Sequence, residues 1–84
     1  MKERAARCRL KVKTRWRYLR REVLGISQAR VARLCNVSRG TVARWESSGS
    51  GMLPDVGSIL TLCVALRYDP ERMFHWLTGG DDRE

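Results

Sequence analysis

The segment Ser27–Glu46 reads SQARVARLCNVSRGTVARWE and holds two short helical patterns separated by a turn. Ser27 and Ser38 are residues of a type that caps helix N-termini. Asn36, between the two patterns, tolerates the left-handed backbone conformation that a tight turn requires. Ala32 is small enough for a second helix to cross the first one closely. The segment therefore predicts two helices of about eight residues joined by a turn of about three or four residues.

The second of these helices is expected to have one apolar and one polar face. Its apolar anchors are Val37, Val42 and Trp45. Its other face is left with Arg39, Gly40, Thr41 and Arg44. Two closely crossing helices, the second with a polar basic face, are what a helix-turn-helix requires.

Helices are also predicted on both sides of this segment. Before it, Thr14 is expected to cap a helix that ends at Gly25 and has the core stripe Trp16, Leu19 and Val23. After it, a fourth helix is expected to begin at Pro54 or Asp55, with an inward face of Val56, Ile59, Leu60, Cys63 and Leu66. Asp69 and Pro70 are a favoured pair for starting a fifth helix, and Gly79 follows its end. The predicted fold is all-α, with five short helices.

The expected domain organisation is a basic N-terminal arm over residues 1–13, a helical domain over 14–78 and a polar tail over 79–84. From Arg7 to Lys13 basic residues alternate with apolar ones. This period of two leaves two interpretations open, a disordered arm or a short strand that pairs across a dimer.

The distribution of charge favours a polyanionic partner. Residues 1–44 contain fourteen Lys and Arg against two Glu, a balance of +12, whereas residues 45–84 contain three Arg against seven acids, a balance of −4. Such a one-sided field suits nucleic acid or an anionic membrane surface, and charge alone does not choose between them. The chain has neither an apolar run long enough to span a bilayer nor a signal peptide, so a cytoplasmic, nucleoid-associated protein of a prokaryotic or phage-infected cell is expected.

Catalysis and metal binding find no support in the sequence. Cys8, Cys35 and Cys63 are scattered, no CxxC occurs, and the single His75 does not complete a zinc site. There is no Gly-rich phosphate loop and no paired-carboxylate arrangement with the histidine. We therefore expect no enzyme, no cofactor and no metal, with Cys35 and Cys63 as small buried apolar residues.

The sequence resembles the lambda-repressor-like, Cro/XRE family of helix-turn-helix proteins from about Trp16 to Leu77. The matching motifs are Leu19-Arg20-Arg21, Gly25-Ile26-Ser27-Gln28, Val31-Ala32, Val37-Ser38-Arg39, Thr41-Val42, Arg44-Trp45-Glu46, Pro54, Leu60, Ala65-Leu66 and Asp69-Pro70. Two departures are Asn36 and Arg67, which stand where Gly is usual, so the turn at Arg67 is expected to have another geometry.

The resemblance implies roles for single residues. Arg39, Gly40 and Arg44 match positions that face base edges, and Thr41 matches one that contacts phosphate or a thymine methyl. Gln28 matches a residue that contacts phosphate and braces the recognition helix. A partly buried salt bridge between Arg21 and Glu46 is implied as well.

Phosphate contacts are also expected from general physical arguments. Ser27 and Ser38 stand at helix N-termini, whose free N–H groups and dipole favour anions. The loop after the third helix lacks Lys and Arg, so Ser47 is expected to supply a contact there. The arm from Lys2 to Lys13 is expected to follow the DNA backbone or enter the minor groove. Lys11, Lys13 and Arg17 are expected to contact phosphate.

The function expected from these features is a dimeric repressor of phage or mobile-element type. It is expected to bind double-stranded DNA at a pseudo-palindromic operator. Neither a small-molecule effector nor a membrane is expected as a partner. Its dimer surface is expected on the fifth helix, at Met73, Phe74, Trp76 and Leu77, unless all four lie in the core of the single chain. Two alternatives stay open. One is an antitoxin that also binds a protein partner, and the other is an arginine-rich RNA-binding protein using Arg7–Arg21.

Overall fold

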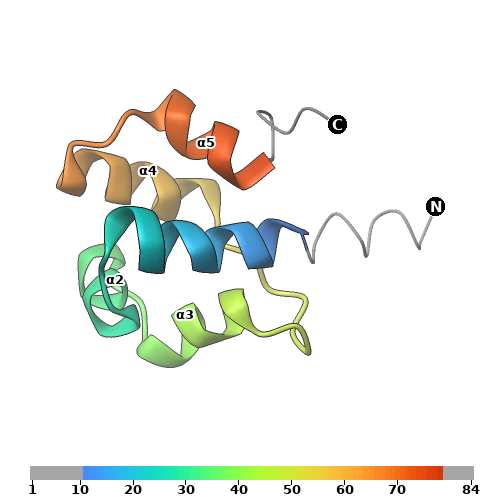
Figure 1. Ribbon diagram of the computed structural model, residues 1–84. Helices are drawn as coiled ribbons and strands as arrows, with labels where there is room; N and C mark the ends of the chain where they lie inside the picture. Colours follow the sequence, from blue (N-terminus) through green and yellow to red (C-terminus); the bar gives the residue numbers. More distant parts are fainter. Residues whose placement is uncertain (1–10, 79–84) are drawn as a thin grey trace.

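The structure, a computed structural model, describes residues 11–78, and helices account for the secondary structure of that range. The first helix is α-helical over residues 11–18 and continues as the wider π-helical segment η1 (Leu19–Leu24). It is followed by α2 (Gln28–Cys35), α3 (Arg39–Glu46), α4 (Val56–Leu66) and α5 (Pro70–Thr78). In Figure 1 the first helix crosses the middle of the molecule, with α4 and α5 on one side and α2 and α3 on the other. The predicted all-α fold is thus confirmed.

Each helix after the first is preceded by an N-cap residue. The side chain of this residue accepts a hydrogen bond from the backbone N–H three residues later. These caps are Ser27, Ser38, Asp55 and Asp69, with donor–acceptor distances of 2.9–3.1 Å. Such a cap satisfies one of the donors that a helix N-terminus leaves unpaired and is worth about 1 kcal/mol. The predicted starts of these four helices are confirmed, because local chemistry fixes them.

Three helices end at a residue in the left-handed conformation. Gly25 has φ 63°, Asn36 has φ 58° and Arg67 has φ 55°. The N–H of Asn36 donates to the carbonyls of Ala32 and Arg33, which is the turn predicted between the two central helices. The expectation of a different geometry at Arg67 was wrong, because this residue adopts the same left-handed cap despite its β-carbon.

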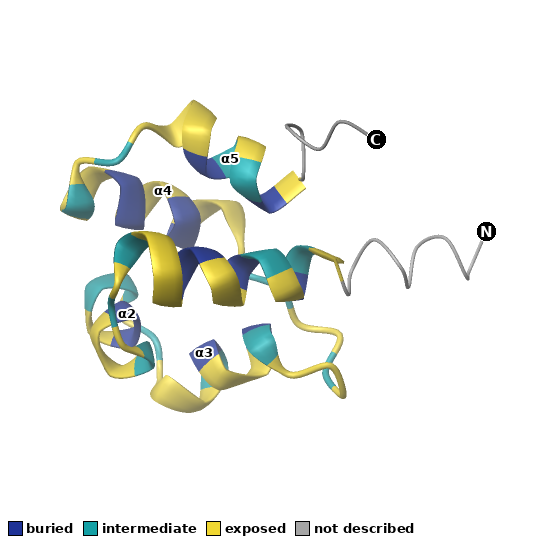
Figure 2. Ribbon diagram, viewed as in Figure 1, coloured by how far each residue is buried: buried dark blue, intermediate teal, exposed yellow. Residues whose placement is uncertain are grey.

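The core lies between the first helix and the other four. Its largest fully buried side chains are Trp16, Trp45, Leu19, Leu62, Met73, Val31 and Val42. Trp16 and Trp45 meet edge to face, with ring centroids 5.8 Å apart and an interplanar angle of 81°. In Figure 2 the buried positions lie on the sides of the helices that face one another, and exposed positions lie on the outside. Within residues 11–78, no helix combines the length and apolarity that crossing a membrane requires.

The N-terminal part of the domain differs from the prediction. Residues 11–13 are already helical, so Thr14 does not begin the helix, and the expected arm boundary between residues 13 and 14 falls inside it. Val23 is 37% exposed instead of buried. In the π-helical turn hydrogen bonds run from residue i to i+5, so Leu24, five residues after Leu19, packs against the core. Residues 1–10 of the predicted arm, with Cys8, and the predicted tail 79–84 lie outside the described range.

The inward face of α4 was predicted only in part. Ile59 and Cys63 are buried as expected, and Leu66 packs against the core. Val56 and Leu60, however, are 60% and 42% exposed, and the fully buried position is Leu62. Since α4 is apolar on both sides, its sequence periodicity did not define which side faces inward.

The predicted dimer surface on α5 was wrong for two of its residues. Met73 and Leu77 are 0% and 3% exposed, because their spacing of four places both on the side of α5 that faces the core. Phe74 and Trp76 are half-buried and also pack against this core. The centroids of the Trp76 and Tyr18 rings lie 5.6 Å apart. The alternative, in which all four residues pack within the single chain, describes the structure better.

Candidate nucleic-acid interface

The outer face of α3 carries the residues predicted to read DNA bases. Val42 and Trp45 turn inward, and Arg39, Gly40, Ala43 and Arg44 are exposed on the opposite side. Thr41 is half-buried at the edge of this face. Ala43 was not predicted, although its position four residues after Arg39 places it on the same face.

The N-terminal end of α3 combines a helix terminus with two hydroxyl groups. Ser38 Oγ accepts the backbone N–H of Thr41 at 3.0 Å and shares a hydrogen bond of 2.9 Å with Thr41 Oγ1. This pair holds the Thr41 side chain beside the first turn of the helix. The helix dipole and the unpaired N–H groups make this end favourable for an anion such as phosphate.

The charge on α2 and α3 has one sign. Arg30, Arg33, Arg39 and Arg44 are all exposed on these two helices. The single acid between Ser27 and Glu46 is Glu46 itself, whose side chain is only 6% exposed and is paired within the protein. The outward surface of the helical pair therefore presents cations with no competing exposed carboxylate of its own.

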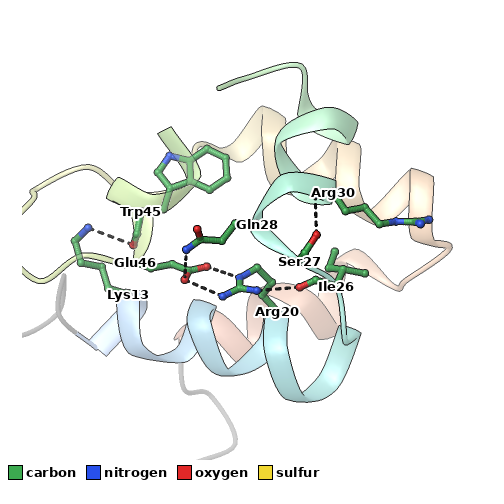
Figure 3. Close-up of polar contacts among 8 residues, drawn as sticks. All are labelled: Lys13, Arg20, Ile26, Ser27, Gln28, Arg30, Trp45 and Glu46. Atoms are coloured by element: carbon green, nitrogen blue, oxygen red, sulfur yellow. Dashed lines mark hydrogen bonds and ion pairs between the residues drawn. The ribbon is translucent and has the colours of Figure 1, made fainter. Parts of the chain in front are cut away.

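Glu46 is the centre of a hydrogen-bond network that joins three parts of the chain (Figure 3). Arg20 Nε donates to Glu46 Oε2 at 2.5 Å, and Arg20 Nη2 donates to Oε1 at 3.0 Å. Gln28 Nε2 donates to the same Oε1 at 3.0 Å, and Arg20 Nη1 donates to the carbonyl of Ile26 at 2.9 Å. The network fixes the C-terminal end of α3 against the first helix and the start of α2.

The predicted partner of Glu46 was wrong by one residue. Arg21 is exposed, whereas Arg20 is 7% exposed and makes the bidentate pair. Arg20 follows Trp16 by four residues and shares its inward face, and Arg21 is one position further around the helix. The expected bracing role of Gln28 is supported by its bond to Glu46.

The surroundings of Glu46 favour its ionised form. Burial alone raises the pKa of this carboxyl group. Hydrogen bonds from Arg20 and Gln28, together with the charge of Arg20, outweigh that effect and hold the pKa below its ordinary value. Glu46 is therefore a permanent anion inside the network near neutral pH.

Lys13 was predicted to contact a phosphate of DNA, but the structure buries it. Its side chain is 3% exposed, and Nζ donates to the carbonyls of Arg44, Trp45 and Met52 at 2.7, 3.2 and 2.6 Å. Burial lowers the pKa of this ammonium group. Two of its acceptors belong to the last turn of α3, where a cation also complements the helix dipole. Lys13 is thus directed into the protein and not toward a phosphate.

A signal for this role was present in the sequence. Lys13, Trp16 and Arg20 follow one another at i, i+3 and i+7, which places them on one face of a helix. Extending the predicted first helix by one turn before Thr14 would have put Lys13 on the inward side.

The other predicted phosphate ligands lie at the surface. Ser27, Ser47, Lys11 and Arg17 are exposed, and Gln28 is half-buried. The hydroxyl oxygens of Ser27 and Ser47 accept backbone N–H groups of Arg30 and Gly49. Both hydroxyl groups keep their O–H as a donor for an anion.

The neighbouring arginines 20 and 21 provide a matched test of the network. We expect Arg20→Ala to lower the free energy of unfolding by roughly 3 kcal/mol, because it leaves the Glu46 carboxylate buried without its cation. Arg21→Ala removes the same charge from an exposed position and is expected to change stability by less than about 0.5 kcal/mol. Urea unfolding of both variants measures the difference. Equal effects would contradict the assignment of Arg20.

Stability is also expected to depend on pH through Glu46. Because its folded pKa is below the unfolded value of about 4.3, the carboxylate contributes stability that is fully present above that pH. This contribution is lost as the pH falls through the folded pKa. Urea unfolding between neutral and acidic pH is expected to show a smaller acid-induced loss for Glu46→Gln than for the unchanged protein. The pKa of Asp55 is also lowered, chiefly by hydrogen bonds from Ser58. Asp55 is therefore expected to account for part of the pH dependence of stability that remains in Glu46→Gln.

Comparison with known proteins adds one finding to this geometry. A family model described as a helix-turn-helix domain matches residues 2–76, which is most of the chain and includes the whole of α2, α3 and α4. No curated protein and no solved structure matches the sequence. The family match agrees with the crossing of α2 and α3 and with the basic outer face of α3. The chain therefore belongs to the helix-turn-helix domain family.

Proposed function

We propose that this protein is a sequence-specific double-stranded DNA-binding transcriptional regulator of the Cro/XRE type, acting as a dimeric repressor. The observation that carries the proposal is the exposed face of α3, where Arg39 and Arg44 flank the small residues Gly40 and Ala43. An α-helix with such a face fits the major groove of B-DNA.

Arg39 and Arg44 are proposed to read base edges. An arginine fork matches the O6 and N7 acceptors of guanine and is worth about 1–3 kcal/mol of discrimination for a well-placed pair. Thr41, half-buried at the side of the same face, is proposed to contact a phosphate or a thymine methyl. The Glu46 network and Lys13 hold α3 from its inner side and so leave these outward residues to the DNA.

Phosphate contacts are proposed at the two helix N-termini and the loop after α3. Ser27 and Ser38 combine a hydroxyl donor with free backbone N–H groups, and Ser47 adds a hydroxyl beyond the other end of α3. Lys11 and Arg17 extend the basic surface along the first helix. These contacts would set the register of α3 in the groove without reading sequence.

Repression is proposed to be steric. A dimer would place two copies of α3 in successive major grooves about 34 Å apart on one face of a pseudo-palindromic operator. A bound dimer that overlaps a promoter prevents polymerase from occupying it. A phage or mobile-element origin is proposed by analogy with the Cro/XRE proteins that the sequence resembles.

The proposal is tested by selecting sequences from a randomised duplex library at two salt concentrations. We expect enrichment of an inverted repeat with half-site centres about 10 base pairs apart. Arg39→Ala is expected to weaken binding to the enriched site by about 1–3 kcal/mol. The variant is also expected to lose the base preference at one position of that DNA site. Arg72→Ala, which removes an exposed arginine of α5, is the matched control and is expected to keep the sequence preference. Tight, salt-sensitive binding without enrichment would contradict the proposal and favour an RNA partner.

Gly40 gives a second test, because the protein itself has no steric need for glycine at this position. A β-carbon added at Gly40 would meet only Ser38 Oγ, at an ordinary distance of 3.7 Å. Glycine costs roughly 1 kcal/mol relative to alanine in a helix interior, and part of that cost applies to Gly40 in the first turn of α3. Gly40→Ala is therefore expected to stabilise the free protein while weakening DNA binding, since the added methyl group lies where the DNA approaches the backbone. Thermal unfolding and titration of the enriched duplex measure the two effects, and unchanged DNA affinity would refute close approach at Gly40.

A further inference from the structure

The outer face of α4 is exposed and carries no charge. It consists of Val56, Gly57, Leu60, Thr61, Val64 and Ala65. Val56 is 60%, Leu60 42% and Val64 81% exposed. The second half of this face is a shallow apolar depression lined by Leu60, Thr61, Val64 and Ala65. A surface helix normally turns polar residues to water, so a continuous apolar outer face indicates a surface that is covered by a partner.

The charge of the molecule favours a second copy of this chain as that partner. The exposed sides of α2, α3 and α5 carry ionised side chains such as Arg30, Arg44 and Glu71, whereas α4 has none. The chain has a net charge of +8, so two copies carry a net electrostatic repulsion for each other. The outer face of α4 is where two such copies can approach without bringing like charges together.

The residue pattern on α4 is complementary to itself. Val56, Leu60 and Val64 form a ridge with a spacing of four residues, and the smaller Gly57, Thr61 and Ala65 form a parallel row beside it. In an antiparallel pair, a two-fold axis beside Leu60 places the two ridges against each other, with Leu60 facing Leu60 and Val56 facing Val64. The two rows of small residues then also face each other and allow the helices to approach closely. An isologous interface requires this reciprocal fit of one patch with itself. A different protein would need no such symmetry on this face.

We propose that the outer face of α4 is the homodimer interface, with the two α4 helices packed antiparallel. The inference deepens the proposed function, which needs two copies at an operator, but its evidence does not depend on DNA. In Figure 1, α4 and α3 lie on opposite sides of the first helix. An α4 interface therefore leaves the exposed face of α3 open to DNA.

The first test measures self-association of the full chain without DNA by sedimentation velocity over a range of micromolar concentrations. The protein is expected to approach twice the 9.7 kDa of one chain as its concentration rises. Val64→Glu introduces a charge at the most exposed position of the face and is expected to weaken self-association roughly tenfold or more. Val23→Glu, at an exposed valine of the first helix, makes the same chemical change elsewhere and is expected to leave self-association unchanged. Circular dichroism verifies that both variants fold.

A charge pair tests the antiparallel register. The two-fold axis places Val56 of one copy near Val64 of the other, while the two positions within one chain are eight residues, about 12 Å, apart. Val56→Lys and Val64→Glu are each expected to weaken the dimer, and the double variant to regain much of the lost association. Failure of the double variant to recover would overturn the antiparallel arrangement.

Two results would overturn the interface itself. One is a protein that stays monomeric at every concentration, and the other is a dimer that Val64→Glu leaves as tight as before. Association with an unrelated protein through this face, without self-association, would equally refute the proposal. The test is separable from the DNA proposal, because library selection with the unchanged protein reports sequence reading whether or not α4 forms the dimer contact.

Discussion

The position of α3 depends on one buried carboxylate. Glu46 takes a bidentate pair from Arg20 and a further bond from Gln28, so the end of α3 is tied to the first helix and to the start of α2. A buried ion pair contributes little net stability compared with apolar packing, but removing one partner is costly because the other is left buried and unpaired. The interaction therefore selects one orientation of α3 among those that Val42 and Trp45 alone would allow.

Lys13 fixes the same end of α3 by different chemistry. Its ammonium group contacts two carbonyls of the last turn and the carbonyl of Met52 in the following loop. At the other end, Ser38 and Thr41 close the first turn with their hydroxyl groups. With both termini and the inner side held by the protein, the outward face is left as the part of α3 available to a ligand. Preorganisation of this kind lowers the ordering cost of binding.

Features governed by local chemistry were predicted from the sequence. Ser27, Ser38 and Asp69 were identified as caps because a short polar side chain at a helix start has few other functions, and Asn36 was identified as a left-handed turn residue for a similar reason. For the fourth helix the start was predicted at Pro54 or Asp55, and Asp55 is the cap. Arg39, Gly40 and Arg44 were placed on an outward face because Val42 and Trp45 defined the inward one.

Features governed by tertiary packing were not predicted. The choice between Arg20 and Arg21 depends on which of two adjacent side chains shares the inward face of Trp16. The orientation of α4 was ambiguous because Val56 and Leu60 are as apolar as Leu62. Lys13 was missed because the predicted first helix began at Thr14 and so excluded the inward face that Lys13 shares with Trp16 and Arg20. The carbonyl groups that it contacts, from Arg44 to Met52, lie about thirty to forty residues away in the chain.

The burial of two cations changes the electrostatic interpretation of the molecule. Part of the +12 balance of residues 1–44 belongs to Lys13 and Arg20, whose charges are directed at carbonyl groups and at Glu46. When a protein binds DNA, the salt dependence of its affinity reports the counterions released by the phosphates that it neutralises. Lys13 and Arg20 release none, so the number of phosphates neutralised by each chain is smaller than its count of basic residues. The charges of these two residues are used by the fold to hold α3 in place.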